Sequence, residues 1–581
     1  MVLDSLATRV ISAALTMYDI MEQRVTTVEQ LSMNRAPFPE MDVLYFCAPT
    51  EESVKSICND FPNNKPGRYG SVHLFFTDII PDDIMNILQS APNLIAKVKT
   101  LRELNLDFVA AESNAFHLDL KDSLPRLLGS AGADELLQQK IAKKLATFCI
   151  SLNEHPSIRY QGNSRVAANI AKQLNEYLKA YRRANPKGAF NGDDAQGERE
   201  RAQLLLVDRT FDPLTPIMHE YSYQCMSYDL LNVEGDNIIS YSSTNNKNET
   251  VLKQALLGEN DPLWVELRHD HIAKVIEKIK TRMNDIIQNS SGAALAKKSG
   301  ANMSITNMAA AVKELPEFTQ TMSKLSQHVA LAQQCMDVFG KQALMDLSTV
   351  EQTISTGADD NGGEVKGAKL TQLVIDTVRA LKNKALKKRL IAIYVAAQRN
   401  VTPATMNQIM DAAGFGPNET VVPKLELLCK PRAPEAVAEP GKAGIFSSIF
   451  GGARKTQKIA ATAEGEYADT RHVCALKAAL DQLIGGELPQ DKFPALGPSI
   501  SSSSEAKANA KSMRRYGANN RWGKRESNIT GSRCICFVVG GVAFSELRAG
   551  YELQTQHSKE VIMGGTHFVA PEEFLEEVSK L

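Results

Sequence analysis

The sequence predicts a multidomain protein of mixed α/β and α class, and three observations lead to this prediction. Apolar strands alternate with helical patterns in the first hundred residues, the middle third is largely helical, and a second α/β unit closes the chain. The chain has 581 residues. At about 150 residues per domain, this length suggests roughly three or four domains.

The first α/β unit is predicted from apolar runs with helix-start signals between them. The runs expected to be strands are DVLYFCAP (42–49), SVHLFFTD (71–78) and LDFVAAES (106–113). Thr50 is expected to cap the helix that follows the first run, and Pro81-Asp82-Asp83 to open the helix that follows the second. Residues 1–4 could form the stub of a further strand. Strands that alternate with helices indicate a parallel sheet.

Helical periodicity dominates from residue 135 onward. The segments with apolar residues at three- and four-residue spacing are 135–152, 167–183, 271–288, 308–339 and 387–398. Pro316 interrupts the fourth segment, so we expect a kink or turn there, because proline lacks the amide hydrogen that a helix interior needs.

The end of the chain is predicted to complete a sheet begun much earlier. LLLVD (204–208) and CFVVGG (536–541) both look like central strands, and VIMGGTHF (561–568) adds another. Two long segments, 431–465 and 498–533, lack the apolar content to order themselves. The second is basic and serine-rich, and we expect it to be a solvated loop.

Composition excludes several classes of protein. The 66 Lys and Arg balance the 67 Asp and Glu, which argues against a polycationic nucleic-acid binder. Nine cysteines, an odd number, lie partly within apolar runs and indicate a reducing compartment. No run of about 18 apolar residues predicts a membrane span. The N-terminus makes a poor signal peptide, so we expect a cytoplasmic protein.

The common enzyme signatures are missing. No phosphate-binding GxxxxGK[ST], dinucleotide-binding GxGxxG or nucleophile-elbow GxSxG motif is present. His219-Glu220 resembles a zinc-protease helix, but Tyr223 stands where the second histidine belongs. We therefore expect no cofactor and no enzymatic activity.

Metal sites find equally little support. A calcium loop starting at Asp359 would need Gly where Glu364 stands and Glu where Leu370 stands. The triplet at 269–271, His-Asp-His, could bind a metal, but it begins a helix expected at the surface. We expect no metal site.

The most distinctive string is LLLVDRTFDPLTPIMHEYSYQCMSYDLL (204–231). Asp208, Arg209 and Asp212 at a strand end could form a catalytic constellation. Alternatively, Arg209 satisfies carboxylates and carbonyls where domains meet, with the prolines fixing the turn. We favour the second interpretation.

This string, together with FVVGGVAFSELRAGYE (537–552), resembles the Sec/Munc (SM) family of syntaxin-binding proteins, most closely its exocytic branch. Segments that also fit are TMYDIMEQRVTTVEQL (16–31), VHLFFTD (72–78), HPSIRYQG (155–162), ENDPLWVELRH (259–269) and GGTHF (564–568). The resemblance implies a three-domain arch. Domain 1 would span 1–105, domain 2 would combine 106–219 with 467–581, and the mostly helical domain 3 would be inserted at 220–466. The family's helix before the first strand is expected to be missing.

The resemblance also implies a function. SM proteins bind a syntaxin-type SNARE between domains 1 and 3, capture its N-terminal peptide on the outside of domain 1, and engage assembling SNARE helices. We therefore expect a regulator or template of SNARE assembly for vesicle docking and fusion in exocytosis. It would be a monomer that reaches the plasma membrane peripherally through its partner and binds no nucleic acid. An SM protein of a Golgi, endosomal or vacuolar step, or an α/β enzyme with an unrecognised site, are the alternatives.

By resemblance, two groups of residues in domain 1 face the partner. Asp4 and Arg9 match the cavity side, where Arg9 would either hydrogen-bond a SNARE carboxylate or remain a solvated charge. The positions matching the pocket for the N-terminal peptide are Met85, Val98, Leu101 and Glu103. An apolar pocket with one acid suits a peptide that has an anchor side chain and a basic residue. Leu101 could equally be ordinary core.

Two further segments carry hypotheses. Pro316 matches the helical hairpin of domain 3, where it could let the hairpin extend or fold back, or simply break a helix. The loop 431–465 carries an apolar cluster, GIFSSIF (444–450), followed by basic residues. That cluster could touch an anionic membrane, although a disordered insert is the interpretation we favour.

Overall fold

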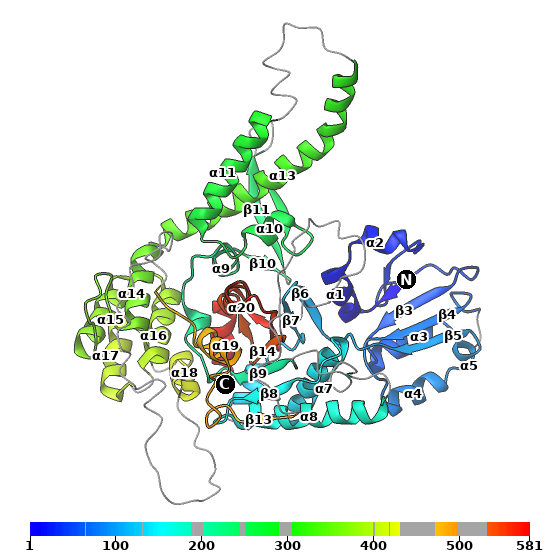
Figure 1. Ribbon diagram of the computed structural model, residues 1–581, viewed down its shortest axis with the longest axis horizontal. Coiled ribbons are helices and arrows are strands. Elements are labelled where there is room, and N and C mark those ends of the chain that lie inside the picture. The colour runs from blue at the N-terminus through cyan, green and yellow to red at the C-terminus, as the bar shows by residue number, and fades with distance from the viewer. Residues whose placement is uncertain are drawn as a thin grey trace, which may run out of the picture.

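The structure is a computed structural model that describes residues 1–63, 66–129, 132–186, 190, 201–235, 237–244, 250–289, 305–398, 401–416, 419–429, 471–497 and 532–581. The N-terminal sheet lies at one end, a seven-stranded sheet lies in the middle, and helices α14–α18 lie at the other end (Figure 1). The predicted α/β and α class is confirmed. The hypotheses on 431–465 and most of the basic stretch 498–533 fall outside the described residues.

Five parallel strands form the N-terminal sheet, in the order β2-β1-β3-β4-β5. They are β1 (Val2–Leu3), β2 (Glu29–Gln30), β3 (Val43–Cys47), β4 (Val72–Phe76) and β5 (Val98–Glu103). The predicted N-terminal stub is confirmed, because β1 pairs with β2 on one side and with β3 on the other.

Helices cover this sheet unequally. The face formed by alternate side chains such as Tyr45 and Leu74 packs against α3 (Glu51–Asn59), α4 (Asp82–Gln89) and α5 (Pro92–Ile95). The other face packs mainly against α1 (Ser5–Ala14), which short α2 (Met17–Glu22) follows. Both predicted helix starts are confirmed. The Thr50 hydroxyl accepts the Ser53 amide at 3.2 Å, and α4 begins at Asp82.

The central sheet is built from two distant parts of the chain, in the order β13-β8-β9-β14-β16-β7-β6. Its strands are β6 (Val109–Glu112), β7 (Ala115–His117), β8 (Ser157–Tyr160), β9 (Gln203–Asp208), β13 (Ala495–Leu496), β14 (Cys534–Val539) and β16 (Val561–Gly565). β9 and β14 are parallel neighbours, with Leu204 opposite Ile535. The prediction that the C-terminal segment completes the sheet of 204–208 is confirmed.

The strand pattern assigned one strand to the wrong sheet. The strand pattern alone grouped the run 106–113 with the strands at 42–49 and 71–78, whereas the division after residue 105 implied by the resemblance placed it in the next domain. In the structure β6 belongs to the central sheet, antiparallel to β7. A two-residue turn at Ser113 and Asn114 joins β6 to β7, so this segment forms a local hairpin. The neighbour of β4 is instead β5, which is mostly exposed.

Helices bury both faces of the central sheet. Leu204 and Leu206 belong to the core with α7 (Glu135–Ser151) and α8 (Arg165–Ala184). Leu205 and Val207 face the opposite core, with α19 (Ala475–Gly485) and α20 (Phe544–His557). The remaining helices of this region are α6 (Ser123–Leu128) and α21 (Pro571–Ser579). Burial on both sides explains why its central strands are continuously apolar.

The inserted helical region also contains a small sheet that the sequence pattern did not predict. Its helices are α9 (Tyr223–Leu230), α10 (Pro262–Leu267), α14 (Leu344–Thr356), α15 (Ala368–Ala380), α16 (Lys384–Gln398), α17 (Pro403–Ala413) and α18 (Val421–Cys429). The short 3₁₀ helix η1 (Thr215–Ile217) precedes them, and the two-residue strands β15 (Val542–Ala543) and β17 (Phe568–Val569) pair near the C-terminus. The small sheet has the order β10 (Val233–Glu234), β11 (Ile238–Thr244), β12 (Thr250–Leu256).

Two long helices, α11 (Ile272–Asn289) and α13 (Ile305–Lys341), rise together from the body as a hairpin (Figure 1). The turn predicted at Pro316 is wrong, because α13 continues through this residue, whereas the kink offered as the other outcome stays a prediction. A proline inside a helix costs about 3 kcal/mol. The helix tolerates this local loss because its C-terminal half is anchored by buried Leu325, Leu331 and Phe339.

Candidate partner-binding surfaces

The distinctive string at 204–231 is buried and serves the packing of segments. Arg209 is fully buried and donates to both carboxylate oxygens of Glu546, at 3.1 and 2.7 Å. Glu546 starts α20 and also accepts the Ala543 amide at 2.9 Å. Arg209 therefore joins β9 to the C-terminal helix through a bidentate ion pair. The interpretation that Arg209 satisfies a carboxylate is confirmed, but the pair lies within the central unit and not where domains were expected to meet.

Both aspartates of this string also accept hydrogen bonds from within the protein. One oxygen of Asp208 accepts from the Ser164 hydroxyl, and the other accepts the Thr210 amide at 2.9 Å. Asp212 accepts the Thr215 amide at 3.0 Å and the Ala475 amide at 2.9 Å. Burial acts to raise the pKa of Asp212, but the nearby charges of His472 and Arg209 outweigh burial and lower it. Both carboxylates thus hold turns and segment junctions together.

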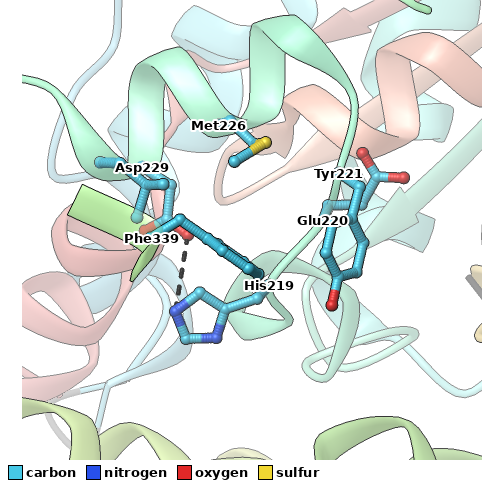
Figure 2. Close-up of a pocket in the computed structure, with 7 residues that line it drawn as sticks. His219, Glu220, Tyr221, Met226, Asp229 and Phe339 are labelled. Carbon is cyan, nitrogen blue, oxygen red and sulfur yellow. Dashed lines mark ion pairs between the residues drawn. The ribbon is translucent and has the colours of Figure 1, made fainter. Parts of the chain in front are cut away.

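A shallow recess follows the string (Figure 2). It is lined by His219, Glu220, Tyr221, Met226, Asp229, Leu230 and Phe339. Its walls lie so close together that no water-sized sphere fits between them, so this recess has no room for a substrate or cofactor.

Buried charges join helices at the wall of this recess. The His219 ring lies 2.8 Å from Glu351 of α14 through Nδ1 and 3.9 Å from Asp229 through Nε2. Asp229 in turn accepts hydrogen bonds from the two terminal guanidinium nitrogens of Arg389 on α16, at 2.7 and 2.8 Å. The arrangement pairs two buried acids with a cation and an imidazole across three helices. We therefore assign these four residues a structural role.

A second buried junction unites other segments that carry the family resemblance. Arg268 donates to Glu259 at 2.6 Å and to the Tyr551 hydroxyl at 3.0 Å, and it stacks over the Tyr551 ring. The same hydroxyl accepts the Asn114 amide at 3.2 Å. His269 packs against the Tyr551 ring, and burial, with the charge of Arg268, lowers the pKa of His269 to about 3. These motif residues meet in the interior, so a binding surface has to be sought elsewhere.

Asp4 anchors the first helix to the N-terminal sheet. Its Oδ1 accepts the Ala7 amide at 2.8 Å, which caps α1. Its Oδ2 accepts the Ala48 amide at 2.7 Å and the Ser53 hydroxyl at 2.9 Å. The carboxylate therefore fixes the orientation of α1 on the β3–α3 connection.

Arg9 lies on α1 and forms an ion pair with Asp119, which follows β7 of the central sheet. The Arg9 side chain keeps 35% of its surface exposed. Arg9 is thus already paired with a carboxylate of the same chain, an arrangement that neither of the two interpretations of this residue predicted. Its exposed part lies at the junction between the two sheets.

Next to α1, the short helix α2 exposes an apolar surface that the sequence reasoning did not single out. Met17, Tyr18 and Met21 are 55%, 60% and 53% exposed, and Leu15 before them is 46% exposed. Positions 17, 18 and 21 share one face of a helix. Met17 and Met21 at i, i+4 in a short polar helix could have signalled it. In Figure 1, α1 and α2 lie on the side of the N-terminal sheet nearer α10 and the helical hairpin.

The four residues assigned to a peptide pocket lie together at the open edge of the N-terminal sheet. Strand β5 is the edge strand, and Val98, Leu101 and Glu103 pair with Val72, Leu74 and Phe76 of β4. Paired residues point to the same face, so all three side chains share the face that α4 covers. Met85 of α4 and Val98 pack against the same core.

This edge combines apolar and acidic surface. Leu101 is 41% exposed, so the alternative that it belongs to the core is wrong. Ile79, in the loop before α4, is 54% exposed. Glu103 accepts the Ile80 amide at 2.8 Å, which places its carboxylate beside that loop. The result is an exposed aliphatic side chain with a carboxylate two residues along the same strand face.

The base of the helical hairpin is fixed by a buried polar cluster. Asp261 caps α10 and accepts from Lys324 at 2.9 Å, and His328 Nε2 lies 3.3 Å from the same carboxylate. The other ring nitrogen of His328 lies 3.0 Å from the Tyr223 hydroxyl. α13 is therefore held firmly around residues 324–328, and Pro316 lies on the helix beyond this anchor.

Other kinds of site find no support in the part of the chain that the structure describes. There, no helix combines the length and apolarity needed to cross a bilayer, and no group of His, Cys, Asp or Glu is placed to hold a metal ion. All nine cysteines lie within the described residues and form no disulfide.

Comparison with known proteins identifies close similarity over the whole chain. A family model described as the Sec1 family matches residues 1–577. The chain is 31% identical to the protein transport protein sec1 of Dictyostelium discoideum, covering 100% of this chain and 94% of that protein. It is 27% identical to the SNARE-interacting protein KEULE of Arabidopsis thaliana, covering 100% and 91%. Among solved structures, the Unc18–syntaxin 1 complex from Monosiga brevicollis matches with a TM-score of 0.78 and 25% identity, covering 100% and 94%.

Proposed function

The chain belongs to the Sec1 family, and from this premise we propose that it binds a syntaxin-type SNARE and regulates or templates SNARE assembly for vesicle docking and fusion in exocytosis. The similar Monosiga protein was solved as a complex with syntaxin 1, and the Arabidopsis relative is named as SNARE-interacting. The observation that carries the proposal is the pair of exposed apolar surfaces on the N-terminal unit, at α2 and at β5.

The α2 surface suits a helical partner. Met17, Tyr18 and Met21 present flexible and aromatic side chains that adapt to an amphipathic helix. Arg9 lies on the preceding helix, pairs with Asp119 and keeps 35% of its side-chain surface exposed. We propose that this surface contacts the SNARE helices, and that Asp4 acts by holding α1 in place.

The β5 edge suits the N-terminal peptide of the SNARE. Leu101, Val98 and Met85 supply an apolar wall, and Glu103 supplies a charge for a basic peptide residue. An edge strand also offers unpaired backbone groups to an extended segment. We propose this edge as the peptide pocket.

The remaining expectations follow as parts of the same proposal. The chain would act without catalysis and reach the plasma membrane peripherally through its partner. Its domains would divide after residues 105, 219 and 466. The α11–α13 hairpin would engage assembling SNARE helices, with Pro316 as the position at which it extends or folds back.

Calorimetry tests the function and the trafficking step together. The chain is titrated with cytoplasmic domains of plasma-membrane, Golgi, endosomal and vacuolar syntaxin-type SNAREs, each with and without its N-terminal peptide. We expect tightest binding to a plasma-membrane member. Preference for another compartment would contradict the exocytic step alone, whereas no binding to any SNARE would contradict the proposal.

Leu101→Lys tests the peptide pocket. Fully burying a leucine contributes about 1.5–3 kcal/mol, and a peptide can cover only the 41% of Leu101 that is exposed, so peptide-dependent affinity should fall about three- to eightfold. Leu136→Lys, at a leucine that is 76% exposed on α7, is the matched control and should bind normally. Normal affinity of Leu101→Lys for the peptide would show that the pocket lies elsewhere, without affecting the broader function.

A further inference from the structure

Strand β12 is an unusually open sheet edge. It runs for seven residues beside β11 in unbroken antiparallel register, and none of the described strands pairs with its other side. Leu252 and Leu256 are 71% and 57% exposed on one face, and Val251 is 39% exposed on the other. Natural proteins usually protect edges with charges, bulges, prolines or short strands, because an open edge pairs readily with another chain.

The other edges among the described strands carry such protection. The edge strands β2, β10 and β13 have only two residues each, and the pairing of β6 with β7 is irregular. β5 contains a bulge and exposes Lys99, Arg102 and Glu103. β12 has no bulge and no proline, and its single charge is Lys253. Its openness therefore calls for an explanation.

The backbone of β12 points alternate residues outward. The Leu257 amide donates to the Asn237 carbonyl at 2.9 Å, so odd-numbered residues of β12 bond toward β11. In an antiparallel pair the intervening residues direct both N–H and C=O away from the partner. Leu252, Gln254 and Leu256 therefore offer their backbone groups to the open side. The exposed leucine side chains belong to these same residues.

This pattern is complementary to itself. Two β12 strands can pair antiparallel about a two-fold axis at Gln254, which places Leu252 opposite Leu256 of a second copy, twice. Lys253 then faces Ala255 of the second copy. A two-fold axis at Lys253 would instead set two ammonium groups opposite each other. We propose that β12 is a self-association edge that joins two copies of this chain through the Gln254-centred register.

The neighbouring helix permits this pairing. α13 packs against β11 on the face that carries Ile239 and Tyr241. With strands about 4.8 Å apart, β11 and its counterpart would lie about 14 Å apart in the joined sheet. Packed helices approach to about 8–10 Å, so both α13 helices fit. One strand pair buries less than the roughly 1,200–2,000 Å² of stable interfaces, so the dimer is weak and concentration-dependent, and the expected monomer is the form present at low concentration.

Engineered cysteines test the register. In a hydrogen-bonded antiparallel pair the Cα atoms lie about 5.5 Å apart, within disulfide range. Gln254→Cys should therefore give a cross-linked dimer under mild oxidation, as should the double variant Leu252→Cys/Leu256→Cys. Leu252→Cys alone is the matched control, because its two copies would lie about 13 Å apart along the strands. Equal cross-linking of Gln254→Cys and Leu252→Cys, or none in Gln254→Cys, would overturn the proposal.

A proline variant tests the association without cross-linking. Gln254→Pro removes an amide that points outward, so the ladder with β11 loses no bond. Sedimentation from about 1 to 200 µM should show a dimer in the natural chain that is lost in Gln254→Pro, with similar thermal unfolding of both. A single mass at every concentration, or undiminished association of Gln254→Pro, would refute the assignment. SNARE binding is measured separately and does not depend on either result.

Discussion

Replacing Glu546 by glutamine should destabilise the protein more than any comparable surface change. Arg209 and Glu546 have fully buried side chains joined by two hydrogen bonds of 3.1 and 2.7 Å. The amide of Glu546→Gln would remove the carboxylate that binds the buried guanidinium directly, leaving Asp208 and Asp212 as the nearby negative charges, and would turn an NH₂ group toward another donor. Breaking a buried pair in this way costs about 3–5 kcal/mol.

The same helix offers a matched control. Glu552 of α20 pairs with Lys477 at 2.6 Å, but the two side chains are 40% and 32% exposed. Exposed pairs contribute about 0–1 kcal/mol because water screens the charges. Glu552→Gln should therefore change stability little. The comparison isolates burial, since both substitutions remove one carboxylate from α20.

Thermal unfolding measures the difference. For a cooperative unit of 150–250 residues, 1 kcal/mol shifts Tm by about 2–4 °C, so Glu546→Gln should lower Tm by about 6–20 °C. The double variant Arg209→Met/Glu546→Leu should recover part of this loss, because apolar residues can replace a buried pair. Equal Tm values for Glu546→Gln and Glu552→Gln would refute the assignment of Arg209–Glu546 as a structural junction.

Three further outcomes are expected. Burial acts to raise the pKa of Asp261, but His328 and Lys324 outweigh it and lower the pKa below 3.8. Asp261 thus adds stability above about pH 4 that is lost on acidification, and Asp261→Asn should show a smaller difference in Tm between pH 6 and pH 3 than the natural chain. Asp4→Ala should cost about 0.5–2 kcal/mol as a lost cap and speed hydrogen exchange in α1; unchanged exchange would contradict the anchor. Tyr551→Phe leaves buried donors unpaired and should cost about 1–3 kcal/mol in urea unfolding, and a neutral result would argue against the junction.

Local patterns predicted the elements whose burial is either uniform or regularly periodic. The apolar run at 204–208 is buried on both faces, so composition alone marks it as a central strand. The helix at 135–151 and its neighbour at 165–184 follow from apolar spacing in the same way. The pairing of β9 with β14, from distant parts of the chain, could also be predicted, because both runs are apolar throughout and so have to be buried on both faces.

The elements that sequence reasoning missed are exposed or depend on distant contacts. β11 carries the polar run IISYSST, and β5 is mostly exposed, so neither shows the apolar pattern of a buried strand. The pattern of 106–113 does predict a strand, but only its pairing decides which sheet receives it. Proline is a local signal, yet the cost of Pro316 is outweighed by the anchored remainder of α13.

Within the candidate site, the edge strand β5 shows most clearly what local sequence patterns cannot predict. Strict alternation places residues 98 and 101 on opposite faces of a strand, because three steps separate them. The register shift opposite Val72 and His73 skips Lys99, and this bulge turns Leu101 onto the face of Val98. A periodicity argument would therefore have divided the peptide pocket between two sides of the sheet. Only resemblance could group these positions before the structure was known, and the bulge supplies the physical reason why they lie together.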